Sequence, residues 1–145
     1  MSHSFRFLDD IATADLAFHT AGDSLQRVFH GATWAVSEAM ADPSTVGSTW
    51  RKPVERTEED PAELLFDWLS DLVYWKDADG VVFSTFKLTL TCGDDGSWHL
   101  KAELCGESVN GLVQVLRNDV KGITKHMYQV SQEDMRWNAR VVVDV

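Results

Sequence analysis

Acidic side chains interrupt two apolar stretches of this 145-residue sequence, one near each end. Asp15 stands in the run A-D-L-A-F, and Asp144 stands in the run V-V-V-D-V. Aspartate is disfavoured inside a β-strand, although solvent on one face of a sheet is reason enough to keep it there. Lys121, in the run V-K-G-I-T, is a third polar residue of this kind. Taken singly, each is better explained as a solvated strand residue than as part of a site.

The two aspartates together suggest more than either does alone. If their strands are neighbours, both carboxylates converge on one patch, and the terminal carboxylate of Val145 adds a third group. Clustered carboxylate oxygens are the ligands that Ca²⁺ and Mg²⁺ prefer. The residues therefore suggest a divalent-cation site (Ca²⁺ or Mg²⁺) at Asp15, Asp144 and Val145. The hypothesis depends on a strand pairing that the sequence does not reveal.

The other reactive side chains form no catalytic pattern. The histidines include no H-x-H or H-x-x-x-H pair, which argues against zinc. His126 is the one nearest to Lys121, but five residues apart the two point to opposite faces of an ideal strand. The sequence has no G-x-S-x-G, no phosphate-cradling glycine loop and no Cys–His nucleophile pair. We predict a protein that is not itself an enzyme. A metal-dependent hydrolase using the aspartate pair is the alternative.

A helix beginning after Asp60 is the element that the sequence predicts most clearly. Asp60 is suited to cap it, Pro61 suits its first turn, and Glu63 follows at the capping-box position. Apolar residues spaced by three and four fill one face: Leu64, Leu65, Trp68, Leu69, Leu72 and Val73. The run D-A-D-G at 77–80 predicts the turn that follows it.

Period-two patterns predict strands on either side of two helices. Strands are expected at 5–8, 14–18, 82–92, 97–105, 119–130 and 135–145, with at most a short one near 50–54. The other helix begins at an Asp23 cap and ends near Asp42. These elements predict an α+β fold, with two helices packed on one face of a mostly antiparallel sheet. Because both helices need the same sheet, we expect residues 1–145 to form a single domain.

Composition narrows the class of function. The chain is 44% hydrophobic, which is typical of a globular protein. A formal net charge of −10, with only 13 scattered basic residues, argues against direct nucleic-acid binding. It fits a basic partner surface, a cation, or simple solubility. No apolar run is long enough to cross a membrane, and the N-terminus lacks a signal-peptide apolar region. We therefore expect a soluble cytoplasmic protein.

Five motifs, in order along nearly the whole chain, resemble those of the archease family. F-L-D-D-I-A-T-A-D-L-A-F at 7–18 resembles its N-terminal signature, in which a D-H-T-A-D-I motif ends in a functional aspartate. The helix and strand at 60–84 give the strongest match. G-E at 106–107 and V-K-G-I-T-K-H at 120–126 resemble the family's G-E and V-K-A-I-T-Y-H blocks. V-V-V-D-V at 141–145 resembles its last strand.

This resemblance implies a fold and a role. The fold is a strand-helix-strand-strand type domain with an added sheet element. The role is that of an accessory activator of an RtcB-type RNA ligase, which joins 2′,3′-cyclic phosphate or 3′-phosphate ends to 5′-hydroxyl ends in tRNA splicing and RNA repair. The activator promotes guanylylation of the ligase and multiple turnover. The same resemblance leaves open a chaperone-like module for RNA-modifying enzymes such as tRNA methyltransferases.

The resemblance also carries individual residues over to this chain. Asp15 and Asp144 occupy the positions that bind a divalent cation in the family. Lys121 occupies the position of a functional lysine contact. His126 matches the last residue of the V-K-A-I-T-Y-H block, with no role assigned to it.

The chain departs from the family pattern at a few positions. Ala12 stands where the family often has histidine, and Ile11 stands where it often has a first aspartate. Asp10, or its neighbour Asp9, replaces that first acid if the alignment slips by one residue. Lys125 stands where an aromatic residue is common.

Overall fold

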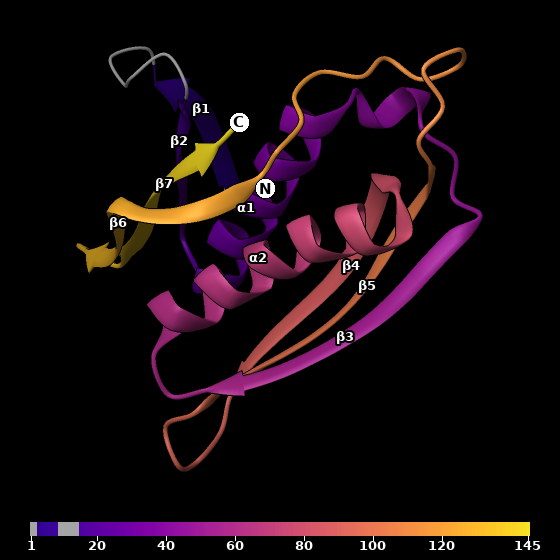
Figure 1. Cartoon of the computed structure of the whole chain (residues 1–145). Coiled ribbons are helices and arrows are strands. Elements are labelled where there is room, and N and C mark those ends of the chain that lie inside the picture. The colour runs from indigo at the N-terminus through magenta and orange to yellow at the C-terminus, as the bar shows by residue number, and fades with distance from the viewer. Residues whose placement is uncertain (1–2, 9–14) are drawn as a thin grey trace.

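Antiparallel strands enclose two long helices in the computed structural model, which describes residues 3–8 and 15–145. The elements are β1 (His3–Leu8), β2 (Asp15–Gly22), α1 (Leu25–Met40), the 3₁₀ turn η1 (Pro43–Thr45), β3 (Trp50–Glu58), α2 (Pro61–Asp79), β4 (Val81–Cys92), β5 (Trp98–Ser108), β6 (Gly122–Glu133) and β7 (Arg136–Asp144). One sheet has the order β1-β2-β7-β6 and the other β3-β5-β4. Figure 1 shows both helices between the two sheets.

The α+β class, with two helices on antiparallel strands, is confirmed. The strands nevertheless divide into two sheets, where the sequence predicts one. Helix α1 supplies the physical reason, because its buried positions run almost all round it and include consecutive residues such as 35–37. One sheet can cover only one side of a helix, so a helix that is buried almost all round needs a second layer on its other side. Among the described residues, no helix is long and apolar enough to cross a membrane.

Helix α1 starts one residue later than the sequence suggests. Its N-cap is Ser24, whose hydroxyl accepts a hydrogen bond from the Arg27 amide at 3.2 Å. The predicted cap, Asp23, instead forms an ion pair with the Arg27 side chain at 3.4 Å. Serine and aspartate are comparably good caps, so propensity alone could not choose between these neighbours.

Helix α2 begins where the sequence predicts. The Asp60 carboxylate accepts a hydrogen bond from the Ala62 amide at 2.9 Å, and Pro61 occupies the first turn. Glu63, predicted to complete a capping box, instead pairs with Lys125 of β6. The helix ends at Gly80, whose φ of 62° is a left-handed conformation that favours glycine.

Strand β3 is the element most underestimated from the sequence. It runs over Trp50–Glu58 and pairs with β5 along its whole length, where at most a short strand at 50–54 is predicted. It is an edge strand, and its central Pro53 and charged residues are typical of edges. Such a strand lacks an apolar run, so its length depends on pairing with a partner far along the chain.

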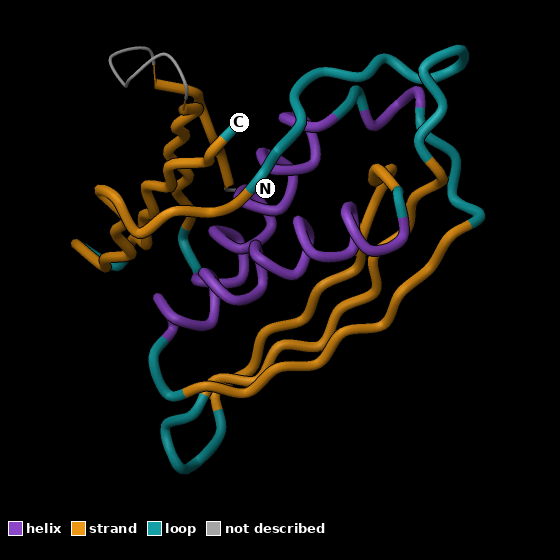
Figure 2. The backbone as a smooth tube through the Cα atoms, in the orientation of Figure 1, coloured by secondary structure: helices purple, strands orange, loops and turns teal. Residues whose placement is uncertain are grey.

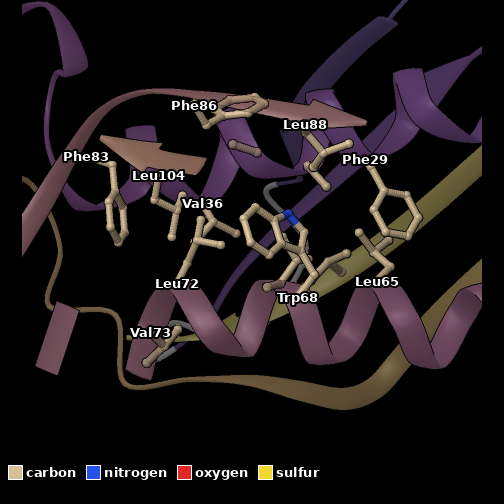
Figure 3. Packing of buried hydrophobic residues seen from close by; sticks show 14 of the residues in the cluster. Phe29, Val36, Leu65, Trp68, Leu72, Val73, Phe83, Phe86, Leu88 and Leu104 are labelled. Carbon is tan, nitrogen blue, oxygen red and sulfur yellow. The ribbon is translucent and has the colours of Figure 1, made fainter. Parts of the chain in front are cut away.

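A buried tryptophan joins the two helices. The Trp68 side chain is fully buried, and its indole N–H donates to the Thr33 hydroxyl at 2.9 Å. That hydroxyl donates in turn to the Phe29 carbonyl at 2.6 Å. Figure 3 shows the indole among Phe29, Leu65 and Leu88, which come from both helices and from β4. The only polar atom of the indole is thus satisfied in an otherwise apolar layer.

We predict that Thr33→Val weakens the fold through this hydrogen bond. Valine keeps the shape of threonine but leaves the buried indole N–H without its acceptor, so the free energy of unfolding should fall by about 1–3 kcal/mol. Urea unfolding measures the loss. The control is Thr89→Val, the same change at an exposed position of β4. A Thr33→Val variant as stable as the wild type would contradict the role given to this bond.

Carboxylates and one arginine connect β3 to α2. The Arg56 guanidinium donates two hydrogen bonds to Asp71, at 2.6 and 2.8 Å. A hydrogen bond to Asp67, together with burial, raises the pKa of Glu58 to about 7, and Arg56 opposes the shift. Between pH 4.5, the ordinary pKa of glutamate, and about pH 7, Glu58 therefore stays protonated in the folded protein. Stability linked to this proton is complete below that window and is lost as the pH rises through it.

We predict that Glu58→Gln flattens the pH dependence of the thermal midpoint between pH 5 and pH 8. Glutamine stays neutral, so the destabilisation that accompanies ionisation of Glu58 disappears. Thermal unfolding of wild type and variant across this range provides the measurement. Glu59→Gln, at the exposed neighbouring position, should leave the wild-type profile unchanged. The same flattening in both variants would mean that net charge alone sets the profile.

Candidate functional site

Asp15 and Asp144 are direct cross-strand partners in the antiparallel pair of β2 with β7. The strand pairing required by the sequence hypothesis is therefore present. Partners in an antiparallel pair project to the same face, with Cβ atoms roughly 4.5–5.5 Å apart. Both residues are half-buried. Two carboxylates thus stand side by side at one end of the four-stranded sheet.

The pair lies on the sheet face directed away from the helices. The neighbouring positions Leu16 and Val143 belong to the other face, which packs against the core. Along the outer face, the next partners are Ala17 and Val142, and both are fully buried. The carboxylates therefore stand next to buried apolar positions of the same two strands. Figure 1 shows β2 and β7 side by side, with the chain end at C.

On its other side, Asp144 pairs with Gly122 of β6. A Cβ atom placed on Gly122 would meet nothing within 4 Å, so the third position of this row is open. The Lys121 amide donates to the Asp144 carbonyl at 2.8 Å and anchors the backbone there. Lys121 therefore lies beside the aspartate pair, with an exposed side chain. The predicted residues Asp15, Asp144 and Lys121 are brought together.

The other predicted site residues do not add a side chain to the group of Asp15, Asp144 and Lys121 in the described part of the chain. His126 is exposed in the segment where the β6–β7 register shifts, between Thr124 and Gln129. The Val145 side chain packs against the hydrophobic core, although its backbone directly follows Asp144. Asp10 lies outside the described residues. Within 3–8 and 15–145, no three or more His, Cys, Asp or Glu residues are grouped to hold a metal.

The donor set partly fits a hard divalent cation. Asp15 and Asp144 offer carboxylate oxygens, and the open position at Gly122 leaves space beside them. Mg²⁺ is commonly held by one or two carboxylates and retains several waters, whereas Ca²⁺ takes six to eight oxygen ligands. The described residues therefore supply enough carboxylates for a hydrated Mg²⁺ and only part of a Ca²⁺ shell.

A second exposed feature escaped the sequence analysis. In residues 109–116, between β5 and β6, Leu112 is 95% exposed and Val113 is 66% exposed. The buried Gln114 holds this loop, because its side chain accepts from the Asn110 amide at 2.9 Å and donates to the Ser108 carbonyl at 3.0 Å. Figure 2 traces the loop in teal towards the start of β6. The sequence contains a sign of this loop, because its apolar residues follow neither the spacing of three and four typical of a helix nor the alternation typical of a strand.

Helices enclosed by two antiparallel sheets, with a carboxylate pair on the outer face, define a class of small α+β protein. The chain belongs to the archease family. The model described as "Archease protein family (MTH1598/TM1083)" matches residues 5–145. This is a family of non-catalytic proteins.

Relatives and solved structures agree with this assignment. Protein archease of Methanothermobacter thermautotrophicus is 38% identical over 141 residues, covering 97% of this chain and 98% of that protein. Protein archease of Sulfolobus acidocaldarius is 33% identical with the same coverage. The solution structure of protein 1598 of Methanobacterium thermoautotrophicum has a TM-score of 0.81 at 37% identity, covering 97% of this chain and 98% of that one.

A more distant structure shares the fold. The crystal structure of an archease and possible chaperone from Thermotoga maritima has a TM-score of 0.61 at 16% identity. It covers 97% of this chain and 98% of that chain. At this identity the likeness extends to the fold alone.

We predict that Asp144→Asn stabilises the protein in buffer containing a chelator. Removing one of two like charges on facing positions should raise the free energy of unfolding by about 0.2–1 kcal/mol. Added Mg²⁺ or Ca²⁺ should stabilise the wild type, because a ligand of the folded state shifts the unfolding equilibrium, and should leave the variant unchanged. Thermal unfolding with Asp94→Asn, in the exposed β4–β5 turn, is the matched control. Equal cation stabilisation of all three proteins would rule out this site.

Proposed function

We propose that this protein activates an RNA ligase of the RtcB type by presenting the Asp15–Asp144 pair to the ligase. The observation that carries the proposal is the direct facing of these two carboxylates on an outer sheet face. Membership of the archease family supports the partner class, through the motifs at 7–18, 120–126 and 141–145. The absence of a nucleophile pattern in the sequence favours an accessory role over catalysis.

A divalent cation would be held by Asp15 and Asp144 in this proposal. When bound, it supplies concentrated positive charge that offsets the two carboxylates and attracts oxygen ligands of a partner. The chain's own contribution is positional. The β2–β7 register holds the two aspartates opposite each other, and the Lys121 amide fixes the Asp144 backbone. Exposure of the Lys121 side chain leaves it available for contact with the ligase.

The negative net charge of this protein favours its encounter with an RNA ligase. The chain carries a formal net charge of −10. An RNA ligase must present a basic surface to its substrate, and opposite charges accelerate diffusional association. The same charge disfavours direct binding of RNA by this protein. The proposal therefore places RNA on the ligase alone.

The second candidate function is a chaperone-like module for RNA-modifying enzymes such as tRNA methyltransferases. The loop at 109–116 favours it, because Leu112 and Val113 are exposed while the polar Gln114 is buried. An apolar surface held in a fixed conformation is suited to contact another protein. If this second function is correct, partner binding would depend on Leu112 more than on Asp144.

We predict that substoichiometric wild-type protein stimulates multiple-turnover RNA ligation by its cognate RtcB-type ligase. Asp15→Ala and Asp144→Ala should each reduce the stimulation by about tenfold or more, as expected for loss of a group that binds or positions a metal. The assay measures ligated RNA against time, and Asp94→Ala is the control carboxylate. Circular dichroism establishes that the variants are folded. Full stimulation by both aspartate variants would refute the acidic-site mechanism.

The same assay separates the two candidate functions. Leu112→Asp places a charge on the exposed apolar loop and leaves the aspartate pair intact. Loss of activity in Leu112→Asp alone, with capture of a methyltransferase, would favour the chaperone function. A wild-type protein that does not stimulate the ligase at all would exclude the ligase proposal.

A further inference from the structure

A row of cationic and imidazole side chains crosses the outer face of the four-stranded sheet. Arg6 of β1 is the register partner of His19 of β2, and His19 is the partner of Arg140 of β7. Register partners share a face, and His19 lies an even number of residues from Asp15 along β2, so the row shares the aspartates' face. The two groups are separated by four residues, or roughly 13 Å. The row is therefore distinct from the aspartate pair.

The row lines a groove of about 410 Å³. Uncharged donors from two further strand positions complete its wall, because Asn138 of β7 and Ser131 of β6 are cross-strand partners there. The groove has one carboxylate, Glu133, near the β6–β7 turn. A volume in this range is typical of sites for small molecules. Four strands contribute to its lining, which makes the arrangement of donors depend on the whole sheet.

The two arginines of this groove form no ion pair with Glu133, the carboxylate that lines it. Among the described residues, no ion pair involves Arg6 or Arg140, even though the chain as a whole carries a net charge of −10. Arg140 donates through Nε to the Met127 carbonyl at 3.3 Å, which orients its guanidinium without neutralising it. Two guanidinium groups that flank a histidine thus remain available to an anion.

His19 responds to these neighbours. Burial lowers its pKa first, and Arg6 and then Arg140 lower it further, while a hydrogen bond with Asn138 raises it. The imidazole is therefore held neutral at neutral pH, with one N–H to donate. An anion between the two arginines would offset their charge and favour protonation of His19.

We propose that this groove binds a phosphate group, held by Arg6 and Arg140 from opposite sides with His19 and Asn138 as donors between them. Arginine presents paired N–H donors that match phosphate oxygens. A phosphate has oxygens directed to several sides and can meet donors from three strands, whereas a carboxylate presents two oxygens in one plane. The groove exceeds the size of a phosphate ion, so a phosphomonoester of a small molecule suits it as well as free phosphate.

The test is an NMR titration of the full chain in chelator, carried out in the Asp144→Asn background so that no bridging cation contributes. Inorganic phosphate and adenosine monophosphate are the two probes. We expect saturable amide shifts at His19, Asn138 and Arg140 with either probe. Tighter binding of the nucleotide would identify a phosphomonoester site, and equal binding would identify a site for the phosphate group alone. Shifts that do not saturate, or that spread evenly over the chain, would overturn the proposal.

Variants locate the binding and control for general charge. Arg6→Gln and Arg140→Gln should each weaken binding by about tenfold or more, since each removes a charge-assisted hydrogen-bond donor. Arg51→Gln, on the other sheet, removes the same charge and should leave affinity unchanged. Equal weakening by all three would mean that only net charge matters.

Sulfate, which keeps its charge across this pH range, tests the role of His19. In the Asp144→Asn background, the affinity of the protein for sulfate should rise as the pH falls from 7.5 to 5.5, because His19 gains a proton. The groups facing His19 are Arg6 on β1 and Asn138 and Arg140 on β7, with Glu133 across the groove on β6. His19→Gln should remove the pH dependence but keep the site. An unchanged pH dependence in His19→Gln would overturn the part assigned to this residue.

Discussion

The contact between the two helices sets the position of everything around it. Trp68 fills the space between α1 and α2, and its hydrogen bond to Thr33 fixes how the helices lie against each other. Helix α1 packs on β1 and β2 on one side and on β4 on the other, while α2 packs on β6 and β3. A change in the helix pair would therefore displace both sheets. Close packing transmits such shifts, because protein interiors have little free volume.

The sheet that carries the candidate site joins the two ends of the described chain. Strands β1 and β2 precede both helices, and β6 and β7 follow all other elements, yet β2 pairs with β7. Asp15 and Asp144 face each other although both helices and the middle strands lie between them in the sequence. Contacts between distant segments cost the most chain entropy and form slowly. The aspartate pair is consequently a property of the completed fold.

The sequence predicted those features of the fold that depend on residues close together in the chain. The Asp60 cap, the apolar stripe of α2 and the Gly80 terminus could be recognised because each involves residues within one or two turns. The length of β3 and the division into two sheets could not, since they depend on pairing and on coverage of α1 from two sides. For the site, Asp15, Asp144 and Lys121 could be named, but their proximity required the register. The row of Arg6, His19 and Arg140 was missed for the same reason.

One face of the four-stranded sheet carries two aspartates at one end and two arginines farther along, because Asp144 and Arg140 are four residues apart on β7, and Arg6 on β1 lies in the same row as Arg140. This separation gives the face an electric dipole in the strand direction. Its ends, roughly 13 Å apart, are farther from each other than the screening length of about 8 Å at physiological ionic strength. In a dilute buffer the dipole would turn an approaching charged molecule before contact. At cellular salt each end would act on its own nearest neighbours.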